Sequence, residues 1–348
     1  MTPASYPDGP RLLADIGGTN ARFALACAPG RISAMLTLPC ADYPRFEDAA
    51  RAYLDGVGAG VRHAVVAIAN PVHGDAVRMT NHDWHFSIAA ARAELALDTL
   101  LVVNGFTALA MSLPGLGAAE LRQIGGGQAR AGGAIGLVGA GTGLGVSGLV
   151  PAGGQWVALE SEGGHVAFSP SDPREVAVLE YLWQRYAHVS AERLVSGPGI
   201  ALIREALAAS CGEAADLSLP TAVIVERALA GSDTLCRQTL DCFCGMLGTV
   251  AANLAVTLGA TGGVYIGGGV VPRLGDYFAA SPFRARFESK GRFSDFTASI
   301  PTLLITAPYP ALTGAAAALA GHLGASHAHA RHGAPIPHSV PESQHASH

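Results

Sequence analysis

Two glycine-rich turns, each set between short apolar strands, constrain the fold of this chain more than any other feature of its sequence. The first is DIGGTNAR at residues 15–22, and the second is GAGTGLG at residues 139–145. Each turn is followed by a third strand and then by helices and strands. The sequence therefore predicts two copies of a β-β-β-α-β-α unit, with a cleft between two domains as the expected place for a ligand.

The apolar runs of the chain give the expected elements of both copies. In the first copy we expect strands at residues 12–15, 23–28, 32–38, 64–69 and 100–103, and helices at 46–54 and 88–95. In the second copy we expect strands at residues 134–138, 145–150, 155–159, 264–266 and 302–305, and helices at 173–186, 199–209, 221–229 and 235–258. A last helix at 311–323 is expected to return to the first domain, which lacks a closing helix of its own.

These elements predict an α/β protein with mixed sheets flanked by helices. The expected small domain comprises residues 10–113 and 306–323, and the expected large domain comprises residues 114–305. The segment 324–348 is rich in His, Ala, Pro and Ser and has little apolar content. Such a segment cannot bury a core of its own, so we expect a disordered tail there.

The composition excludes several classes of protein. Hydrophobic residues make up 49% and charged residues 14% of 348 residues, which favours two well-packed domains. The net charge of −5 argues against a nucleic-acid or membrane-surface partner. We see no uninterrupted apolar run of roughly 18 residues, and residues 1–10 lack the apolar core of a signal peptide. The six cysteines form no CxxC pair. Free thiols in a cytosolic protein are therefore expected.

The two turns carry the features of a phosphate site. The backbone of Gly17 and Gly18, with the Thr19 hydroxyl, can cradle phosphate oxygens. Asp15 ends the preceding strand and could hold Mg²⁺ directly or through water. The second turn opens a strand, unlike a Rossmann fingerprint, and lacks the Gly-Lys-Ser/Thr of a P-loop. Two such turns at matching places suit the two ends of a polyphosphate.

A third glycine cluster, residues 267–269, follows another expected strand. Backbone without side chains there could accept the flat face of an adenine or a ribose. Taken alone, the cluster is better interpreted as a turn that enters a helix.

Polar residues at the ends of apolar strands suggest a sugar site. They are Asn104, Glu162, His165 and Glu192. Planar polar side chains bind sugar hydroxyls well, so their joint presence favours this interpretation. Two simpler alternatives stay open: His165 as a buried core histidine, and Glu192 as a helix cap beside Ser190.

Seven motifs together resemble the ATP-dependent bacterial glucokinases, a family of the hexokinase and actin-like ATPase superfamily. They are ADIGGTNARFAL, MTNHDWHFS, GAGTGLGV, EGGHVAFSP, HVSAERLVSGPG, GGVYIGGGVVPR and FRARFESKGRF. They occur in the family's order across residues 11–323. The related repressor and sugar-kinase group carries a cysteine-rich zinc motif that this chain lacks, so the zinc-free branch fits better.

The resemblance implies two duplicated actin-like (ribonuclease H-like) domains in a cytosolic homodimer. Such an enzyme would make glucose 6-phosphate from glucose, with ATP and Mg²⁺. The implied ATP-binding residues are Ala14, Asp15, Ile16, Gly17, Gly18, Thr19, Gly141, Thr142, Gly143 and Gly268, with Asp15 meeting Mg²⁺ through water. The implied glucose-binding residues are Asn104, Glu162, His165 and Glu192.

One position departs from the family motif Asn-Asp-Phe-Thr, which reads here as Asn104-Gly105-Phe106-Thr107. The resemblance assigns the missing Asp the proton of the sugar 6-hydroxyl. A general base contributes about 10²–10⁴-fold, so a slow kinase is expected. An Asp at position 105 is also expected to cap the helix that begins there.

Three hypotheses follow from these residues. The first is a glucokinase with reduced turnover, which the intact phosphate turns favour. The second is a glucose-binding pseudokinase with a sensing or regulatory role, which Gly105 favours. The third, an actin-like ATPase without a sugar substrate, is disfavoured by the set of Glu162, His165 and Glu192.

Overall fold

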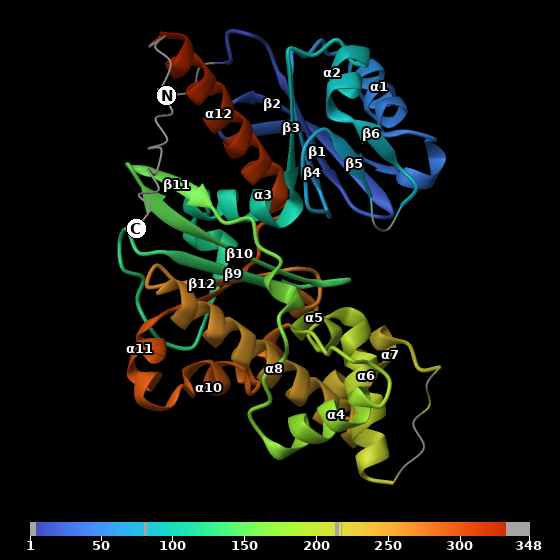
Figure 1. Ribbon diagram of the computed structural model, residues 1–348, viewed down its shortest axis with the longest axis vertical. Helices are drawn as coiled ribbons and strands as arrows, with labels where there is room; N and C mark the ends of the chain where they lie inside the picture. Colours follow the sequence, from blue (N-terminus) through green and yellow to red (C-terminus); the bar gives the residue numbers. More distant parts are fainter. Residues whose placement is uncertain (1–4, 80–81, 213–215, 217, 332–348) are drawn as a thin grey trace, which may run out of the picture.

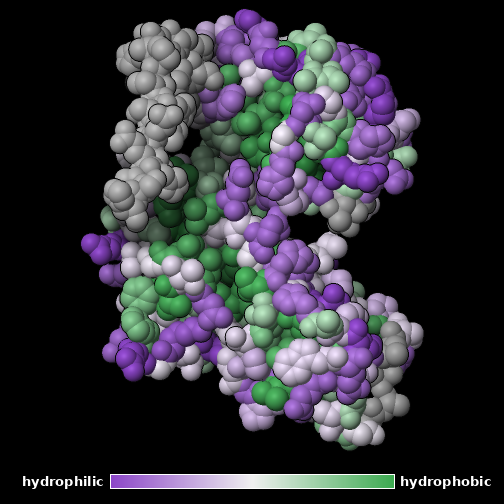
Figure 2. Space-filling view, in the orientation of Figure 1, coloured by the Kyte–Doolittle hydropathy of each residue, from purple (hydrophilic) through white to green (hydrophobic). Residues whose placement is uncertain are grey.

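The computed structural model describes residues 5–79, 82–212, 216 and 218–331. Figure 1 shows two α/β halves stacked along the long axis of the molecule, with helix α3 (Gly105–Ser112) between them and helix α12 (Pro310–Arg331) running along the first half. Figure 2 shows a notch in one side of the molecule, between these two halves. The predicted α/β architecture with mixed sheets and an interdomain cleft is confirmed.

The first half contains a five-stranded mixed sheet in the order β3-β2-β1-β4-β7. Its strands are β1 (Arg11–Ile16), β2 (Asn20–Ala28), β3 (Arg31–Pro39), β4 (His63–Ile68) and β7 (Thr99–Asn104). The first three strands are antiparallel neighbours, whereas β4 runs parallel to both β1 and β7. The sheet is accompanied by α1 (Phe46–Val57), α2 (Ile88–Glu94) and a hairpin of β5 (Ala76–Arg78) and β6 (His85–Ser87).

The second half repeats this pattern in a six-stranded sheet ordered β11-β10-β9-β12-β13-β8. Its strands are β8 (Leu121–Ile124), β9 (Ile135–Ala140), β10 (Leu144–Ala152), β11 (Gln155–Ala158), β12 (Val264–Gly267) and β13 (Thr302–Ile305). An antiparallel β9-β10-β11 meander is again followed by parallel strands, β12 and β13. The sequence did not predict β8, which adds an antiparallel edge.

The helices of the second half pack on its sheet around one long central helix, α8 (Thr234–Leu258). The others are α4 (Pro173–Trp183), α5 (Ala191–Leu194), α6 (Gly197–Ser210), α7 (Thr221–Ala230), α9 (Asp276–Ala280), α10 (Phe283–Glu288) and α11 (Ser294–Ser299). Short 3₁₀ helices are η1 (Cys40–Asp42), η2 (Leu113–Gly115), η3 (Ala118–Glu120), η4 (Gly163–His165), η5 (Val271–Leu274) and η6 (Gly291–Phe293).

Helix α8 begins where the Asp233 side chain accepts the Cys236 amide, and it ends at Gly259 in the left-handed region. Among the described residues it alone has the length and apolar composition of a membrane span, but 78% of its most apolar window is buried within the protein. Its cysteines are free and buried. The helix therefore packs as a core element.

Helix α12 lies against the first sheet, although it is far from that sheet in sequence. Its buried residues Leu312 and Leu319 join a cluster with Leu13 and Val65. It approaches α3 so closely that a Cβ on Gly314 would overlap the Ala108 carbonyl.

The predicted tail at residues 324–348 needs one correction. Helix α12 continues to Arg331, because the alanines of its last turns have a high helix propensity. Residues 332–348 lie outside the described residues.

Candidate active site

The first glycine turn joins β1 to β2 and is narrow. The Gly17 amide donates to the Asn20 carbonyl across the turn at 3.0 Å, and the Cys40 amide donates to the Thr19 carbonyl at 2.9 Å. Ala14 and Ile16 are buried in β1. These two hydrogen bonds fix the path of the turn and use the Gly17 amide within the chain. Gly18 is partly exposed and Thr19 is exposed at the tip of the turn.

Asp15, between these buried residues, pairs with Arg22 directly opposite on β2. The Arg22 Nη1 atom lies 3.2 Å from the Asp15 Oδ2 atom. Burial raises the pKa of the Asp15 carboxyl, and the Arg22 guanidinium partly offsets this rise. The described residues hold no group of three or more His, Cys, Asp or Glu that could bind a metal ion. A lone carboxylate nevertheless fits Mg²⁺, which keeps its waters and takes further oxygens from substrate phosphates.

The second glycine turn joins β9 to β10 and is held from two sides. The Gly141 amide donates to the Gly143 carbonyl at 2.8 Å, and the amide of Gly197 donates to the Gly141 carbonyl at 2.8 Å. Gly197 is the first residue of α6, so the amino end of this helix adjoins the turn. The Gly141 and Gly197 amides are therefore used within the chain, and the Gly199 amide donates to the Ser196 Oγ atom at 3.2 Å. What the amino end of α6 can offer an anion beside the turn is its dipole.

Gly268 lies beside the same turn. Its φ of +82° favours glycine, and a Cβ there would overlap the Ala140 carbonyl. The Val270 amide donates to that carbonyl at 3.1 Å. The third glycine cluster therefore packs on the carboxyl end of β9, next to the second turn.

Phe106 ties the start of α3 to the second turn. A Cβ on Gly139 or on Gly145 would overlap the Phe106 ring. These two glycines pair with each other across β9 and β10. This role of Phe106 was not predicted from the sequence, because a ring that packs against glycines of other strands leaves no signal in its own segment.

Asn104 ends β7 and is the N-cap of α3. Its Oδ1 atom accepts the amides of Phe106 at 2.7 Å and Thr107 at 3.2 Å. Its Nδ2 atom donates to the Asn70 carbonyl at 3.1 Å. Both ends of the Asn104 amide group are thereby fixed.

Gly105 is the first residue of α3, and this placement changes one expectation. An Asp at position 105 would not be the N-cap, because Asn104 already fills that role. It would lie in the first helical turn, where a negative charge is still favourable. A Cβ at this position would meet only backbone atoms of Ile68, at 3.4 Å or more, so a side chain has room.

Glu162, His165 and Glu192 come together in space from two segments of the chain. The His165 Nε2 atom lies 3.9 Å from Glu162 Oε2 and 3.9 Å from Glu192 Oε1. These separations are too long for hydrogen bonds. The side chains are 60%, 57% and 34% exposed for His165, Glu162 and Glu192. The cluster thus presents polar atoms to solvent.

Both simpler alternatives for these residues are wrong. His165 is exposed, so it is no buried core histidine. Ser190 is the N-cap of α5, with its Oγ accepting the Arg193 amide at 3.2 Å. Glu192 has a different role: its Oε2 atom accepts the amide of Leu144, the first residue of β10, at 2.9 Å.

Backbone hydrogen bonds hold the two segments of this cluster together. The Ala191 amide donates to the Val166 carbonyl at 2.8 Å, and the Phe168 amide donates to the Val189 carbonyl at 3.1 Å. The His188 Nε2 atom lies 2.9 Å from the His165 carbonyl oxygen. Residues 162–168 and 188–192 therefore form one unit, which Glu192 joins to the second glycine turn.

Comparison with known families decides where this chain belongs. The sequence model of the family described as Glucokinase matches residues 12–322. The chain belongs to the glucokinase family.

Curated relatives agree with this assignment. A glucokinase of Chromobacterium violaceum is 56% identical over 315 residues, which cover 90% of each chain. A glucokinase of Neisseria meningitidis is 53% identical over 323 residues, covering 92% of this chain and 98% of the relative. The "Bifunctional protein glk" of Burkholderia thailandensis is 60% identical over 321 residues, or 92% of this chain. This chain spans about half the length of the first curated relatives that it matches.

Solved structures confirm the fold of this glucokinase-family chain. A glucokinase from an Antarctic psychrotroph has a TM-score of 0.83 at 38% identity, covering 90% of this chain and 99% of that one. A Balamuthia mandrillaris glucokinase in complex with glucose has a TM-score of 0.75 at 20% identity, covering 90% and 94%. A ROK family glucokinase from Streptomyces griseus, in complex with glucose and AMPPNP, has a TM-score of 0.61 at 20% identity, covering 88% and 98%.

Proposed function

We propose that this chain transfers the terminal phosphoryl group of ATP to the 6-hydroxyl of glucose. The observation that carries the proposal is that the Glu162–His165–Glu192 cluster adjoins the second glycine turn, through Glu192 and Leu144. A polar cluster with unfilled hydrogen-bonding capacity suits a polyol, and a backbone turn suits a phosphate. Their contact supports a sugar bound next to the phosphate that it would receive.

In this proposal, Glu162, His165 and Glu192 bind glucose hydroxyls, and Asn104 adds a fourth contact. Carboxylates are the stronger of these acceptors, because hydrogen bonds to charged groups are worth about 1.5–3 kcal/mol. Two structural neighbours, the Balamuthia mandrillaris and Streptomyces griseus glucokinases, were solved in complex with glucose, which supports glucose as the sugar.

The nucleotide would lie along the two glycine turns. Residues 14–19 would meet one part of the polyphosphate, Gly141, Thr142 and Gly143 another, and Gly268 the nucleoside side. Asp15 would hold Mg²⁺ through water, and the ion would neutralise charge on the phosphates. The AMPPNP complex of one neighbour supports ATP as the donor.

The position of Gly105 predicts slow turnover. Glycine has no side chain that could accept the proton of the 6-hydroxyl, and a positioned general base contributes about 10²–10⁴-fold. Phosphoryl transfer depends mainly on positioning and charge stabilisation, which the other residues would still supply. We therefore propose a weakened kinase. The alternative, a glucose-binding pseudokinase with a sensing role, shares the same site and lacks the transfer.

A coupled assay of ADP formation at high enzyme concentration tests this function, with a sample lacking glucose as the control. We expect slow ADP release that requires glucose. If calorimetry shows binding of both ligands but no ADP forms, the sensing alternative is correct. If glucose does not bind, the proposed function is wrong.

Cytoplasmic location and a homodimer stay predictions from the family resemblance. Sedimentation of the purified chain tests the homodimer, which a single monomeric species at micromolar concentration would exclude.

A further inference from the structure

We infer that Glu192 couples the sugar site to the second glycine turn, and that residue 143 is glycine because this carboxylate occupies the place of its Cβ. The inference rests on the proposed function. It assigns to Gly143 and Glu192 a positioning role, by which glucose and nucleotide strengthen each other's binding.

The two oxygens of Glu192 face different parts of the site. Oε2 accepts the Leu144 amide at 2.9 Å, at the point where the turn becomes β10. Oε1 lies 3.9 Å from His165 Nε2, on the sugar side. Leu144 is buried, so loss of this carboxylate would leave its amide without a partner in the chain. The same side chain therefore holds the turn and faces the sugar.

Gly143 makes room for this arrangement. A Cβ at position 143 would overlap Glu192 Oε2 and lie 3.0 Å from Glu192 Cδ. Its backbone is outside the left-handed region, so an alanine would strain nothing except this contact. Gly141, in the same turn, has no heavy atom within 4 Å of the position of a Cβ. The steric need for glycine thus differs between two glycines of one turn.

A ligand that contacts Glu192 at the sugar site should change the binding of a ligand at the second glycine turn. Glucose that orders the Glu192 carboxylate also orders the Leu144 amide and with it the turn. Coupling between two binding sites is reciprocal, so nucleotide must tighten glucose binding by the same factor. We expect a factor of about five or more, the lower end of typical coupling.

Calorimetry of glucose binding, with and without AMPPNP and Mg²⁺, tests the inference. Gly143→Ala should weaken glucose binding about tenfold and bring the coupling factor close to one. Gly141→Ala, the matched steric control, should keep the glucose Kd measured without nucleotide within about twofold of the parent value. Glu192→Gln should lose glucose affinity but keep more coupling than Glu192→Ala, because the Gln carbonyl can still accept the Leu144 amide.

A double-mutant cycle separates this role from general damage. In a Glu192→Ala background, Gly143→Ala should weaken glucose binding no further, because the displaced side chain is already gone. Equal losses in both backgrounds would overturn the inference, as would a parent coupling factor of one. The Gln and Ala variants at position 192 showing the same coupling would overturn it even if Gly143→Ala fails to fold. If the unsubstituted chain binds no glucose, the proposed function is wrong, and the coupling that rests on it is wrong as well.

Discussion

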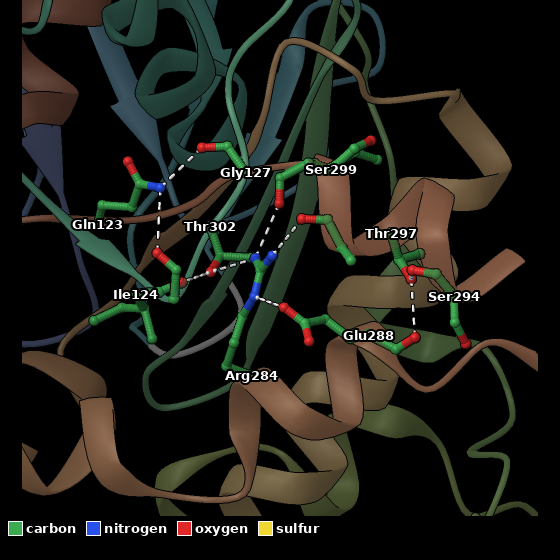
Figure 3. A network of polar contacts seen from close by, with 12 residues as sticks. Gln123, Ile124, Gly127, Arg284, Glu288, Ser294, Thr297, Ser299 and Thr302 are labelled. Carbon is green, nitrogen blue, oxygen red and sulfur yellow. Dashed lines mark hydrogen bonds and ion pairs between the residues drawn. The ribbon is translucent and has the colours of Figure 1, made fainter.

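Two polar clusters in the second half of this molecule use similar residues in opposite ways. Around Arg284, nearly every donor finds an acceptor within the chain (Figure 3). Its Nε atom donates to Glu288 Oε1 at 2.6 Å, and its two Nη atoms donate to the carbonyls of Ile300 and Ala298 at 2.9 Å each. The Arg284 side chain is 9% exposed.

The Glu162–His165–Glu192 cluster is open by comparison. Its members stand 3.9 Å apart, and His165 and Glu162 are mostly exposed. A buried charge must be paired inside the chain, whereas an exposed one can keep its capacity for a ligand. The difference teaches that satisfied polar clusters hold this fold and unsatisfied ones are the candidates for binding.

The same distinction separates two glutamates that the sequence does not tell apart. Glu175 is fully buried, and its oxygens accept the Ser171 amide and Arg286 Nη1 at 2.6 Å each. Burial raises the pKa of the Glu175 carboxyl, and these bonds oppose the rise. Glu162, by contrast, stands beside His165 without a hydrogen bond to it.

Arg284→Met should cause the largest loss of stability. Removing the guanidinium leaves the Ile300 and Ala298 carbonyls and Glu288 without their donor, which costs about 3 kcal/mol or more. Urea unfolding measures the change in free energy. Arg292→Met, at an exposed arginine eight residues away, is the control and should change stability by less than about 0.5 kcal/mol. If the two substitutions lower the free energy of unfolding equally, the satisfied hydrogen bonds of the Arg284 cluster do not hold the fold.

Glu162→Ala should have the opposite effect: a loss of glucose affinity with little change in stability. We expect about a tenfold or greater loss of glucose affinity, since one hydrogen bond to a charged group is lost, with unfolding free energy within about 0.5 kcal/mol of the parent. Thermal-shift titration with glucose and urea unfolding measure both quantities. A glucose affinity equal to that of the parent would exclude Glu162 from the sugar site.

Asp172→Asn should have the smallest effect, and one that depends on pH. The Asp172 carboxylate accepts the Glu175 amide at 3.0 Å and Arg286 Nη2 at 2.8 Å. Burial alone would raise its pKa, but these bonds outweigh burial and lower the pKa. The carboxylate therefore stabilises the fold above the unfolded pKa of about 3.9, and this contribution is lost as pH falls through the lower folded value.

Asn keeps a good N-cap for α4 through its carbonyl oxygen, but it removes the charge and the oxygen that accepts Arg286 Nη2. At pH 7 the Asn variant should be less stable by about 1 kcal/mol. The gap should shrink as the pH falls below about 4. Unfolding curves collected from pH 7 to pH 3 measure it, and a gap that stays constant would rule out the charge as its cause.

The repeated strand pattern of this fold could be read from the sequence, because its strands are short apolar runs next to glycine turns. The strands β5, β6 and β8 could not be predicted from the sequence. Strands β5 and β6 have three residues each, and β8 reads LRQI, without an apolar run. Strands β5 and β6 pair with each other in a short hairpin, whereas β8 pairs with β13, which is far along the chain. Local pattern carries no information on such pairs.

The candidate site was predictable where side chains carry it. Glu162, His165 and Glu192 stood out as polar residues in an apolar chain, and the structure brings them together. The Leu144 amide and the Phe106 ring were missed. The Leu144 amide is a backbone group that every residue except proline possesses, and the Phe106 ring acts by packing against glycines of two other strands. Neither contact leaves a pattern in its own segment.

The turnover of Gly105→Asp, compared with the parent chain, tests the proposed slow kinase most directly. A Cβ at position 105 has room, and the first turn of α3 favours a negative charge, so the variant should fold at least as well as the parent. We predict that glucose-dependent ADP formation rises by about two to four orders of magnitude, with little change in ATP affinity. A variant that binds both ligands yet turns over no faster would show that position 105 is not the place of the missing base.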